Sequence, residues 1–454
     1  MRIRKTTSYN SVFAKGGIEV IIELSVAFSR ACFFVPQFFC SLVPRKKHSL
    51  RLVEIELSAQ FIPPFANTFS VSGHLKKENM KFKLFLILSF LIVKINAQNY
   101  STNFNVNLEN SDIKNIASIW QSYLKTNSKE FWLENEVKNY QNFNILDMSG
   151  ILNPSLMNWG FNNRILSINA VSDNKYLIKS IFESENKEVF AITNVIATKK
   201  NGEFKLSNYI FESTKNWKST DTSNIIYKYR QAYILSNEEV FLANKFYSNI
   251  CSLFDIKPEK LTYFIAENCD NIYEILGYEY IFSKGMSEEC GYFETKNNFI
   301  FATEKAGANH YHEITHYINK YFPNANELLL TGISAYISKD KAHFGKSLIY
   351  HTKRVNEYLS LHNEIDLSKP FEFYKLDENT NPQYVIGAVL CDLILEKGGK
   401  KELISAFQKT KTDDELLFYL KSKIFRKGAD INIILRKKIA EIVRKNEFPE
   451  NLNL

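Results

Sequence analysis

Hydrophobic positions in the first part of the chain change from a helical to a strand period. Five apolar residues recur at helical spacing: Ile113, Ile116, Ala117, Trp120 and Leu124. A second helical stretch follows around residues 131–137. Three later runs favour strands: 175–182, 188–198 and 203–212. Asn201-Gly202 separates the last two and is typical of a two-residue hairpin turn, so we expect a small α+β domain over residues 98–225.

Residues 226–340 are predicted to form a second unit in which strands and helices alternate. Ser236 and Glu239 have capping-box spacing at the start of an amphipathic helix. Strand-like runs follow at 261–266 and 298–303. A histidine-rich segment comes directly after the second run, so the predicted order there is strand, turn and helix.

Two helices are expected to meet after that second strand. The first covers residues 308–318, and Phe322-Pro323 ends it because proline cannot continue a helix. The second begins after Asn324 or Asn326, either of which can cap it.

Residues 341–454 are predicted to form a helical C-terminal subdomain. Asn381 and Pro382 fit the cap and first position of a helix that Gly398-Gly399 ends. Two further helices are expected: 414–424 and 431–443.

Residues 80–97 have a basic start, an apolar run and a small residue before Gln98, which is typical of a secretory signal peptide. A buried helix or a membrane anchor is the alternative, but the apolar run from Leu84 to Val93 is short of the roughly 20 residues that span a bilayer. We therefore expect translation to start at Met80, residues 1–79 to be non-native upstream translation, and the mature chain to be secreted or periplasmic, in a bacterium, with no stable membrane anchor.

The charge balance argues against a nucleic-acid partner. The chain has 57 Lys and Arg against 49 Asp and Glu, a formal net charge of +8. Residues 1–97 hold 14 of the basic and 5 of the acidic side chains, so the remainder is close to neutral. A nucleic-acid or membrane-surface binder needs a concentrated basic surface, which this balance does not suggest.

Four cysteines follow residue 97: Cys251, Cys269, Cys290 and Cys391. In an exported chain they could form one or two disulfides, and the sequence leaves their pairing open. Buried free thiols are the alternative, and none of the four has the paired spacing of a cysteine zinc site.

The candidate chemistry lies in the histidine-rich segment, where His312, Glu313 and His316 form the pattern His-Glu-x-x-His. Residues four apart share one face of a helix, so both imidazoles can bind one Zn2+ ion. Such an ion lowers the pKa of a bound water to about 7, and Glu313 can take a proton as water attacks a carbonyl. The pattern therefore predicts zinc-dependent hydrolysis of peptide bonds.

This arrangement resembles the gluzincin metallopeptidases, in particular the peptidase-MA-like group. In that family a second helix carries Glu-Gly-x-x-x-Tyr, and its Glu is the third zinc ligand. Residues 331–336 here are Thr-Gly-Ile-Ser-Ala-Tyr, so Thr331 stands where the ligand carboxylate is expected. A neutral hydroxyl is a poor zinc ligand. The resemblance implies a small sheet whose edge strand, at 299–303, aligns a peptide substrate, followed by a mostly helical part.

Glu327 is the candidate substitute ligand. It lies four positions before Thr331, one turn along the same helix face. The alternative role is that of a first-turn carboxylate favoured by the helix dipole. Asp340 and His343 are further candidates with less in their favour.

The family resemblance also implies a tyrosine that stabilises the oxyanion, for which Tyr384 and Tyr336 are the candidates. Each also fits the role of a core aromatic. A weaker resemblance links residues 98–225 to the cone-shaped nuclear-transport-factor-like fold. We expect an exported zinc peptidase acting on a peptide or protein substrate. The alternative, favoured by Thr331, is a degenerate peptidase fold that serves as a binding module.

Overall fold

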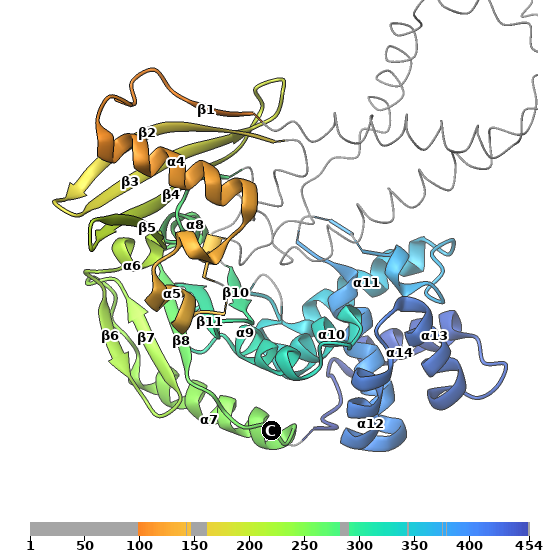
Figure 1. The fold of residues 1–454 in the computed structure, drawn as a ribbon. Helices are drawn as coiled ribbons and strands as arrows, with labels where there is room; N and C mark the ends of the chain where they lie inside the picture. Colours follow the sequence, from red (N-terminus) through yellow and green to blue (C-terminus); the bar gives the residue numbers. More distant parts are fainter. Residues whose placement is uncertain are drawn as a thin grey trace, which may run out of the picture.

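A computed structural model describes residues 99–452, apart from 142, 147–160, 282–289, 343–344, 375 and 378. The expected upstream sequence and signal peptide, residues 1–97, lie outside the described residues. Within the described part of the chain, no helix is both long and apolar enough to cross a membrane. The fold is α+β, as the sequence predicted, with two sheets before residue 304 and helices after it (Figure 1).

A six-stranded sheet forms the first part of the molecule. Its strands are β1 (Tyr100–Thr102), β2 (Asn162–Ser172), β3 (Lys175–Glu183), β4 (Val189–Lys200), β5 (Glu203–Ser207) and β9 (Tyr278–Ile281). Strands β2 to β5 form an antiparallel meander, β1 pairs in parallel with β2, and β9 pairs with β4. The expected strand at 203–212 is wrong in its second half, because the chain turns into helix α6 (Tyr209–Ser213).

Helix α4 (Ser111–Thr126) packs its apolar face onto this sheet (Figure 1). The side chain of Asn110 caps it by accepting hydrogen bonds from the first turn. The 3-10 helix η1 (Lys129–Phe131) and the helix α5 (Glu134–Asn139) follow, as the second helical stretch predicted. Between β4 and β5, Asn201 and Gly202 both have positive φ, which confirms the predicted hairpin turn.

A five-stranded sheet has the order β10-β11-β8-β7-β6. Its strands are β6 (Lys218–Asp221), β7 (Ile225–Tyr229), β8 (Leu261–Ala266), β10 (Gly291–Glu294) and β11 (Phe299–Thr303). Helix α7 (Asn237–Leu253) connects the parallel strands β7 and β8, and α8 (Cys269–Leu276) follows β8. Strand β11 pairs with both β8 and β10, so the expectation that residues 299–303 form the edge is corrected: β10 is the edge strand.

The two sheets share one hydrophobic core. Phe264 of β8 and Phe301 of β11 lie in the same buried cluster as Ile178 of β3 and Trp120 of α4. Strand β9 completes the first sheet although it lies beyond residue 225 in the sequence. The five-stranded sheet is therefore held against the N-terminal part by apolar packing and by a shared strand.

The remaining elements are helical (Figure 1), and most of them pack around a second core, whereas Ile314 lies in a third core with β7, β8 and α7. These helical elements are α9 (Tyr311–Thr315), the 3-10 helices η4 (His316–Tyr321), η5 (Lys339–Lys341) and η6 (Pro370–Glu372), α10 (Glu327–Ile337), α11 (Leu348–Leu361), α12 (Pro382–Lys409), α13 (Asp413–Tyr419), the π-helical turn η7 (Leu420–Ile424) and α14 (Ile431–Lys445). Asn326 and Asn381 cap α10 and α12 as predicted. Gly399, with φ of 64°, interrupts α12 near the predicted end.

Helices α10 and α12 cross at two glycines. A Cβ on Gly332 would lie 2.1 Å from the carbonyl carbon of Gly387, and a Cβ on Gly387 would lie 2.2 Å from the carbonyl oxygen of Leu328. Both distances are far below van der Waals contact, so only glycine permits this backbone approach. The crossing fixes where α10 stands relative to the rest of the helical part.

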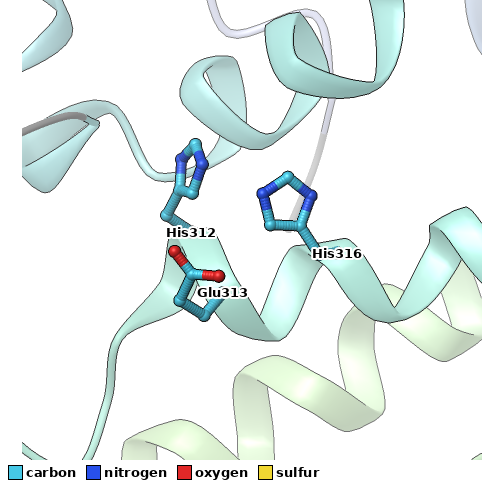
Figure 2. Close-up of side chains that lie close together, drawn as sticks. All are labelled: His312, Glu313 and His316. Atoms are coloured by element: carbon cyan, nitrogen blue, oxygen red, sulfur yellow. The ribbon is translucent and has the colours of Figure 1, made fainter. Parts of the chain in front are cut away.

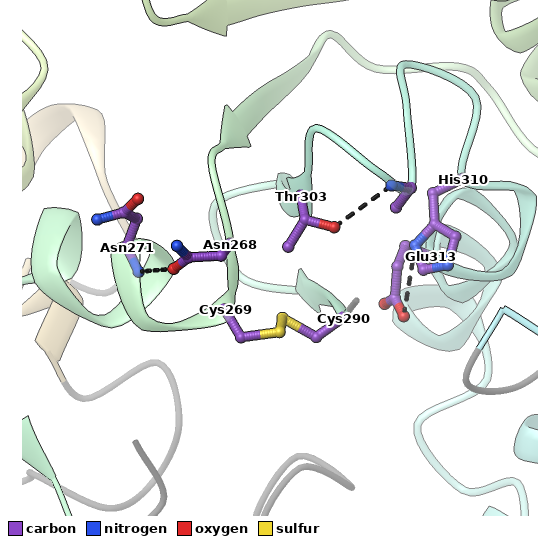
Figure 3. Close-up of a disulfide and its surroundings, with 8 residues drawn as sticks. Asn268, Cys269, Asn271, Cys290, Thr303, His310 and Glu313 are labelled. Carbon is purple, nitrogen blue, oxygen red and sulfur yellow. Dashed lines mark hydrogen bonds and ion pairs between the residues drawn. A yellow bond between two sulfur atoms is a disulfide. The ribbon is translucent and has the colours of Figure 1, made fainter. Parts of the chain in front are cut away.

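Two of the four cysteines described here form a disulfide. Cys269, the first residue of α8, is bonded to Cys290, the residue before β10 (Figure 3). Cys251 and Cys391 are buried free thiols. The disulfide therefore joins α8 to the start of the edge strand.

Candidate metal centre

The segment with the His-Glu-x-x-His pattern is helical, but only its first turn is an α-helix. Helix α9 ends at Thr315, and the chain continues from His316 as the 3-10 helix η4. His312, Glu313 and His316 project from this segment, and one ligand atom of each lies within 4.8 Å of the others (Figure 2). Among the described residues, this is the single group of three or more His, Cys, Asp or Glu that could hold a metal ion.

Three side chains from other elements hold the loop that leads into α9. The Tyr263 hydroxyl donates to the Gly307 carbonyl at 2.8 Å and accepts from the His310 N–H at 3.3 Å. The Tyr227 hydroxyl donates to the Ala308 carbonyl at 3.1 Å. The Glu239 carboxylate accepts from the Ala308 N–H at 2.9 Å. These bonds fix the direction in which the chain enters the site.

Strand β10 forms one wall of the site. A Cβ on Gly291 would lie 2.3 Å from His310 Nδ1 and 2.6 Å from Glu313 Cγ, so glycine is required for the strand to pass this close. The backbone N–H of Phe293 favours the ionised form of Glu313 and acts to lower its pKa. Figure 3 shows His310 and Glu313 near the disulfide, with His310 Nδ1 at 4.0 Å from Glu313 Oε1.

Burial sets the electrostatics of the group. It raises the pKa of Glu313 to about 8, although the Phe293 N–H favours the ionised form. It lowers the pKa of His316 to about 4, with the Asn319 side chain opposing the change. It also lowers the pKa of His310 to about 4, and Lys341 and His316 add to this effect. The imidazoles of His310 and His316 are thus held neutral, the state in which an imidazole binds metal.

Helix α10 supplies hydroxyls to the other side of the site. Ser334 Oγ lies 3.2 Å from His316 Nδ1, and Ser338 Oγ lies 3.5 Å from His312 Nδ1. Asn319 Nδ2 also lies 3.1 Å from His316 Nδ1. The Nδ1 edge of both rings therefore faces polar groups of the protein.

The two candidate tyrosines lie in different places. The ring of Tyr384, on α12, stacks on His312 with centroids 5.6 Å apart, and burial followed by the charge of Glu313 raises its pKa. Tyr336 instead donates to the Pro449 carbonyl and accepts from the Asn451 N–H at 3.1 Å. The Tyr336 hydroxyl thus bonds to the C-terminal segment, and its role at the oxyanion stays a prediction.

Glu327 does not join the metal-binding group. It precedes Ser334 by seven residues, roughly 10 Å along α10 at about 1.5 Å per residue. Burial raises the pKa of its carboxyl to about 7, and the charge of Asp413 adds to the effect. The position fits the alternative role of a first-turn carboxylate, near Asp413 of α13, and the ligand role of Glu327 stays a prediction. Asp340 is likewise absent from the group, and His343 lies outside the described residues.

The chemistry of the donor set fits zinc. Two imidazoles and a buried carboxyl are donors that Zn2+ accepts, and their spacing allows one ion to reach all three. Thr331 is buried on α10, in the place that the family resemblance assigns to a carboxylate ligand. His312 and His316 are thus the residues that would hold the ion, with Glu313 beside it.

Sequence reasoning missed most of the residues that support the site. Tyr263, Tyr227 and Glu239 come from elements far away in the sequence, and no local pattern connects them with α9. Strand β10 was missed because four residues are too few for a clear alternation. One signal was available: the hydroxyls of Ser334 and Ser338, one turn apart on an otherwise apolar helix.

Comparison with known proteins leaves the family open. No family model and no curated protein matches the chain. Similar solved structures include two of the M1 zinc metallopeptidase from Deinococcus radiodurans. The structure of a mutant is 9% identical, has a TM-score of 0.30, and the match covers 62% of this chain and 64% of that chain. The second structure is 8% identical, has a TM-score of 0.29, and the match covers 64% of this chain and 65% of that chain. An aminopeptidase N family protein from Idiomarina loihiensis is similar at 9% identity and a TM-score of 0.24, covering 51% of this chain and 41% of that chain. The chain thus spans just under two thirds of the length of the Deinococcus structures.

Proposed function

We propose that this protein is a zinc-dependent peptidase. The observation that carries the proposal is the convergence of His312, Glu313 and His316 within 4.8 Å of one another in a buried site. When bound there, zinc supplies Lewis-acid chemistry, because it polarises a carbonyl and lowers the pKa of water. The substrate class, a peptide or protein, is supported by β10, which ends the order of the described strands in its sheet and lies beside the site, where an edge strand can align an extended chain.

Glu313 is the general base in this proposal. Its carboxyl lies beside the two imidazoles, and a zinc ion held there would offset the effect of burial on its pKa and favour the ionised form, which can take a proton from attacking water. Tyr384, stacked on His312, is the residue that would donate a hydrogen bond to the developing oxyanion. Burial of His312 and Glu313 limits the access of bulk water to the reacting atoms, whereas His316 is half-buried.

A degenerate site is the second candidate, and one observation favours it. Among the described residues, no further His, Cys, Asp or Glu joins the group, whereas a catalytic zinc ion normally has three protein ligands and a water. In that case the protein would use the peptidase-like site only to bind a partner.

We also propose that the protein works outside the cytoplasm. The signal-like residues 80–97 suggest export. The Cys269–Cys290 disulfide supports the same compartment, because structural disulfides persist where thiols are oxidised.

Zinc content and peptide hydrolysis of the purified chain, from residue 98 onward, test the function. The variant is Glu313→Gln, and the matched control is Glu327→Gln, which makes the same change at another carboxyl of raised pKa. We expect about one zinc per chain in all three proteins. Hydrolysis of a mixture of quenched fluorogenic peptides should fall roughly 100-fold or more in Glu313→Gln only.

Two results would contradict the proposal. Undiminished hydrolysis in Glu313→Gln would assign the chemistry to other residues. Wild-type protein that holds far less than one zinc per chain and cleaves no peptide would favour the degenerate site. A third result concerns the ligands alone: loss of zinc in Glu327→Gln would show that Glu327 is a ligand.

A further inference from the structure

Two buried serines, Ser334 of α10 and Ser338 at its C-terminal cap, face the two imidazoles of the site. Ser334 Oγ is 3.2 Å from His316 Nδ1, and Ser338 Oγ is 3.5 Å from His312 Nδ1. The serines are four residues apart, as are the histidines, so one turn of α10 matches one turn of the histidine segment. Ser334 is fully buried and Ser338 is 4% exposed, which leaves little access for water to replace either hydroxyl.

The hydroxyl protons of both serines are already used. Ser334 Oγ donates to the Leu330 carbonyl at 3.0 Å, and Ser338 Oγ donates to the Ser334 carbonyl at 2.6 Å. A hydroxyl has a single proton, so after this donation its oxygen can only accept. The hydrogen bond with each imidazole therefore needs the proton on Nδ1 of the ring.

We propose that Ser334 and Ser338 are positioning residues that hold His316 and His312 in the tautomer with the proton on Nδ1 and the lone pair on Nε2. A neutral imidazole can have its proton on either nitrogen, and the partner of one nitrogen decides which of them can bind metal. The inference rests on the proposed zinc function and names the atom, Nε2, that each ring offers to the ion.

Asn319 agrees with this assignment once its side-chain amide is rotated. As placed, its Nδ2 is 3.1 Å from His316 Nδ1 and would donate to it, which fits the other tautomer, whereas its Oδ1 is buried and has no hydrogen-bond partner among the described residues. Rotation of the amide by 180° brings Oδ1 to the ring, where it accepts the Nδ1 proton together with Ser334. Ser334 and Asn319 would then both accept at Nδ1 of His316, whereas Ser338 lies at the longer distance of 3.5 Å from His312 Nδ1.

The test uses the chain from residue 98 onward with Ser334→Ala, Ser338→Ala and the double variant. Thr352→Ala is the matched control, because Thr352 is fully buried, its hydroxyl donates to the carbonyl four residues back, and it lies on α11, outside the segments that carry the candidate ligands and the two serines. The first measurement is the 15N spectrum of the histidine rings in the zinc-free protein, in which Nδ1 and Nε2 give separate signals. The second is the zinc dissociation constant from competition with a chelator.

We expect the wild-type spectrum to show the proton on Nδ1 of His316 and His312. Ser334→Ala should weaken zinc binding about 10-fold, since Asn319 remains, and the double variant about 100-fold, the range for lost outer hydrogen bonds at metal sites. Thr352→Ala should bind zinc as the wild type does. The single variant Ser338→Ala should have the smaller effect because its contact is longer.

Two outcomes would overturn the inference: a wild-type proton on Nε2 of His316, or wild-type zinc affinity in the double variant. Failure of the proposed function looks different, because a wild type that binds no zinc would leave the tautomers to be read from the zinc-free spectrum. If the double variant does not fold, the wild-type spectrum and the single variants decide.

Discussion

Replacing Tyr263 by Phe tests whether the loop before α9 positions the site. The hydroxyl that is lost donates to the Gly307 carbonyl at 2.8 Å and accepts from the His310 N–H at 3.3 Å. The Tyr263 side chain has no exposed surface, so water cannot reach either group after the change. A buried polar group left without a partner costs about 1–3 kcal/mol, and the bond to His310 is long. We therefore expect a loss of about 2–4 kcal/mol in the free energy of unfolding.

Tyr247→Phe is the matched control. Its hydroxyl also makes two backbone bonds, donating to the Glu259 carbonyl at 2.8 Å and accepting from the Glu259 N–H at 3.1 Å. Glu259 is exposed, so water can satisfy the groups that are left, and the expected loss is about 1 kcal/mol.

Urea unfolding followed by tryptophan fluorescence gives the two free energies, and chelator competition gives the zinc affinity. We expect Tyr263→Phe to weaken zinc binding while Tyr247→Phe leaves it unchanged, because of these two tyrosines Tyr263 is the one that bonds to the loop before His312. Equal losses of stability in the two variants, with zinc affinity unchanged in both, would refute the reasoning. The loop would then be fixed by α9 itself.

Two further predictions concern packing and pH. Gly332→Ala places a Cβ 2.1 Å from the Gly387 carbonyl carbon, so α10 and α12 must separate; we expect a loss of about 3 kcal/mol, measured by thermal unfolding, and an unchanged melting temperature would contradict it. Burial raises the pKa of Glu136 from 4.5 to about 7, so its contribution to stability is fully present below pH 4.5 and is lost as the pH rises through 7. That contribution is about 3 kcal/mol at about 1.4 kcal/mol per pKa unit, and Glu136→Gln should remove it from urea unfolding measured between pH 5 and pH 8.5; a variant with the wild-type pH dependence would show that another group is responsible.

Local signals in the sequence predicted those helices and strands that begin or end at a residue whose own chemistry, or that of its neighbours in the sequence, favours the boundary. The strand at 261–266 has the predicted bounds, and Asn326 caps α10 as its side-chain chemistry suggests. The capping-box pattern was half right. Ser236 accepts from the Glu239 N–H at 3.2 Å, but the Glu239 carboxylate bonds to Ala308 instead of the helix end. A tertiary bond took the place of the local one.

In the candidate site, too, the sequence specifies the local features and does not specify those that depend on tertiary packing. His312, Glu313 and His316 converge because helical spacing brings them together, which the sequence specifies locally. The roles expected for Glu327 and Tyr336 depended on how α10 is rotated and shifted relative to α9. That position is set by contacts with α12 and with the C-terminal segment, which no periodicity reports.

The glycine crossing changes what a short sequence pattern can mean. Gly332 belongs to the segment that resembles a metallopeptidase motif, yet its place is explained by the backbone of Gly387 on α12. A glycine at this position is therefore required by the short distance between two helices and does not indicate a metal site. Two chains can share it by descent or by packing alone and differ in every ligand, so recognition of such sites needs the side chains that face the histidines.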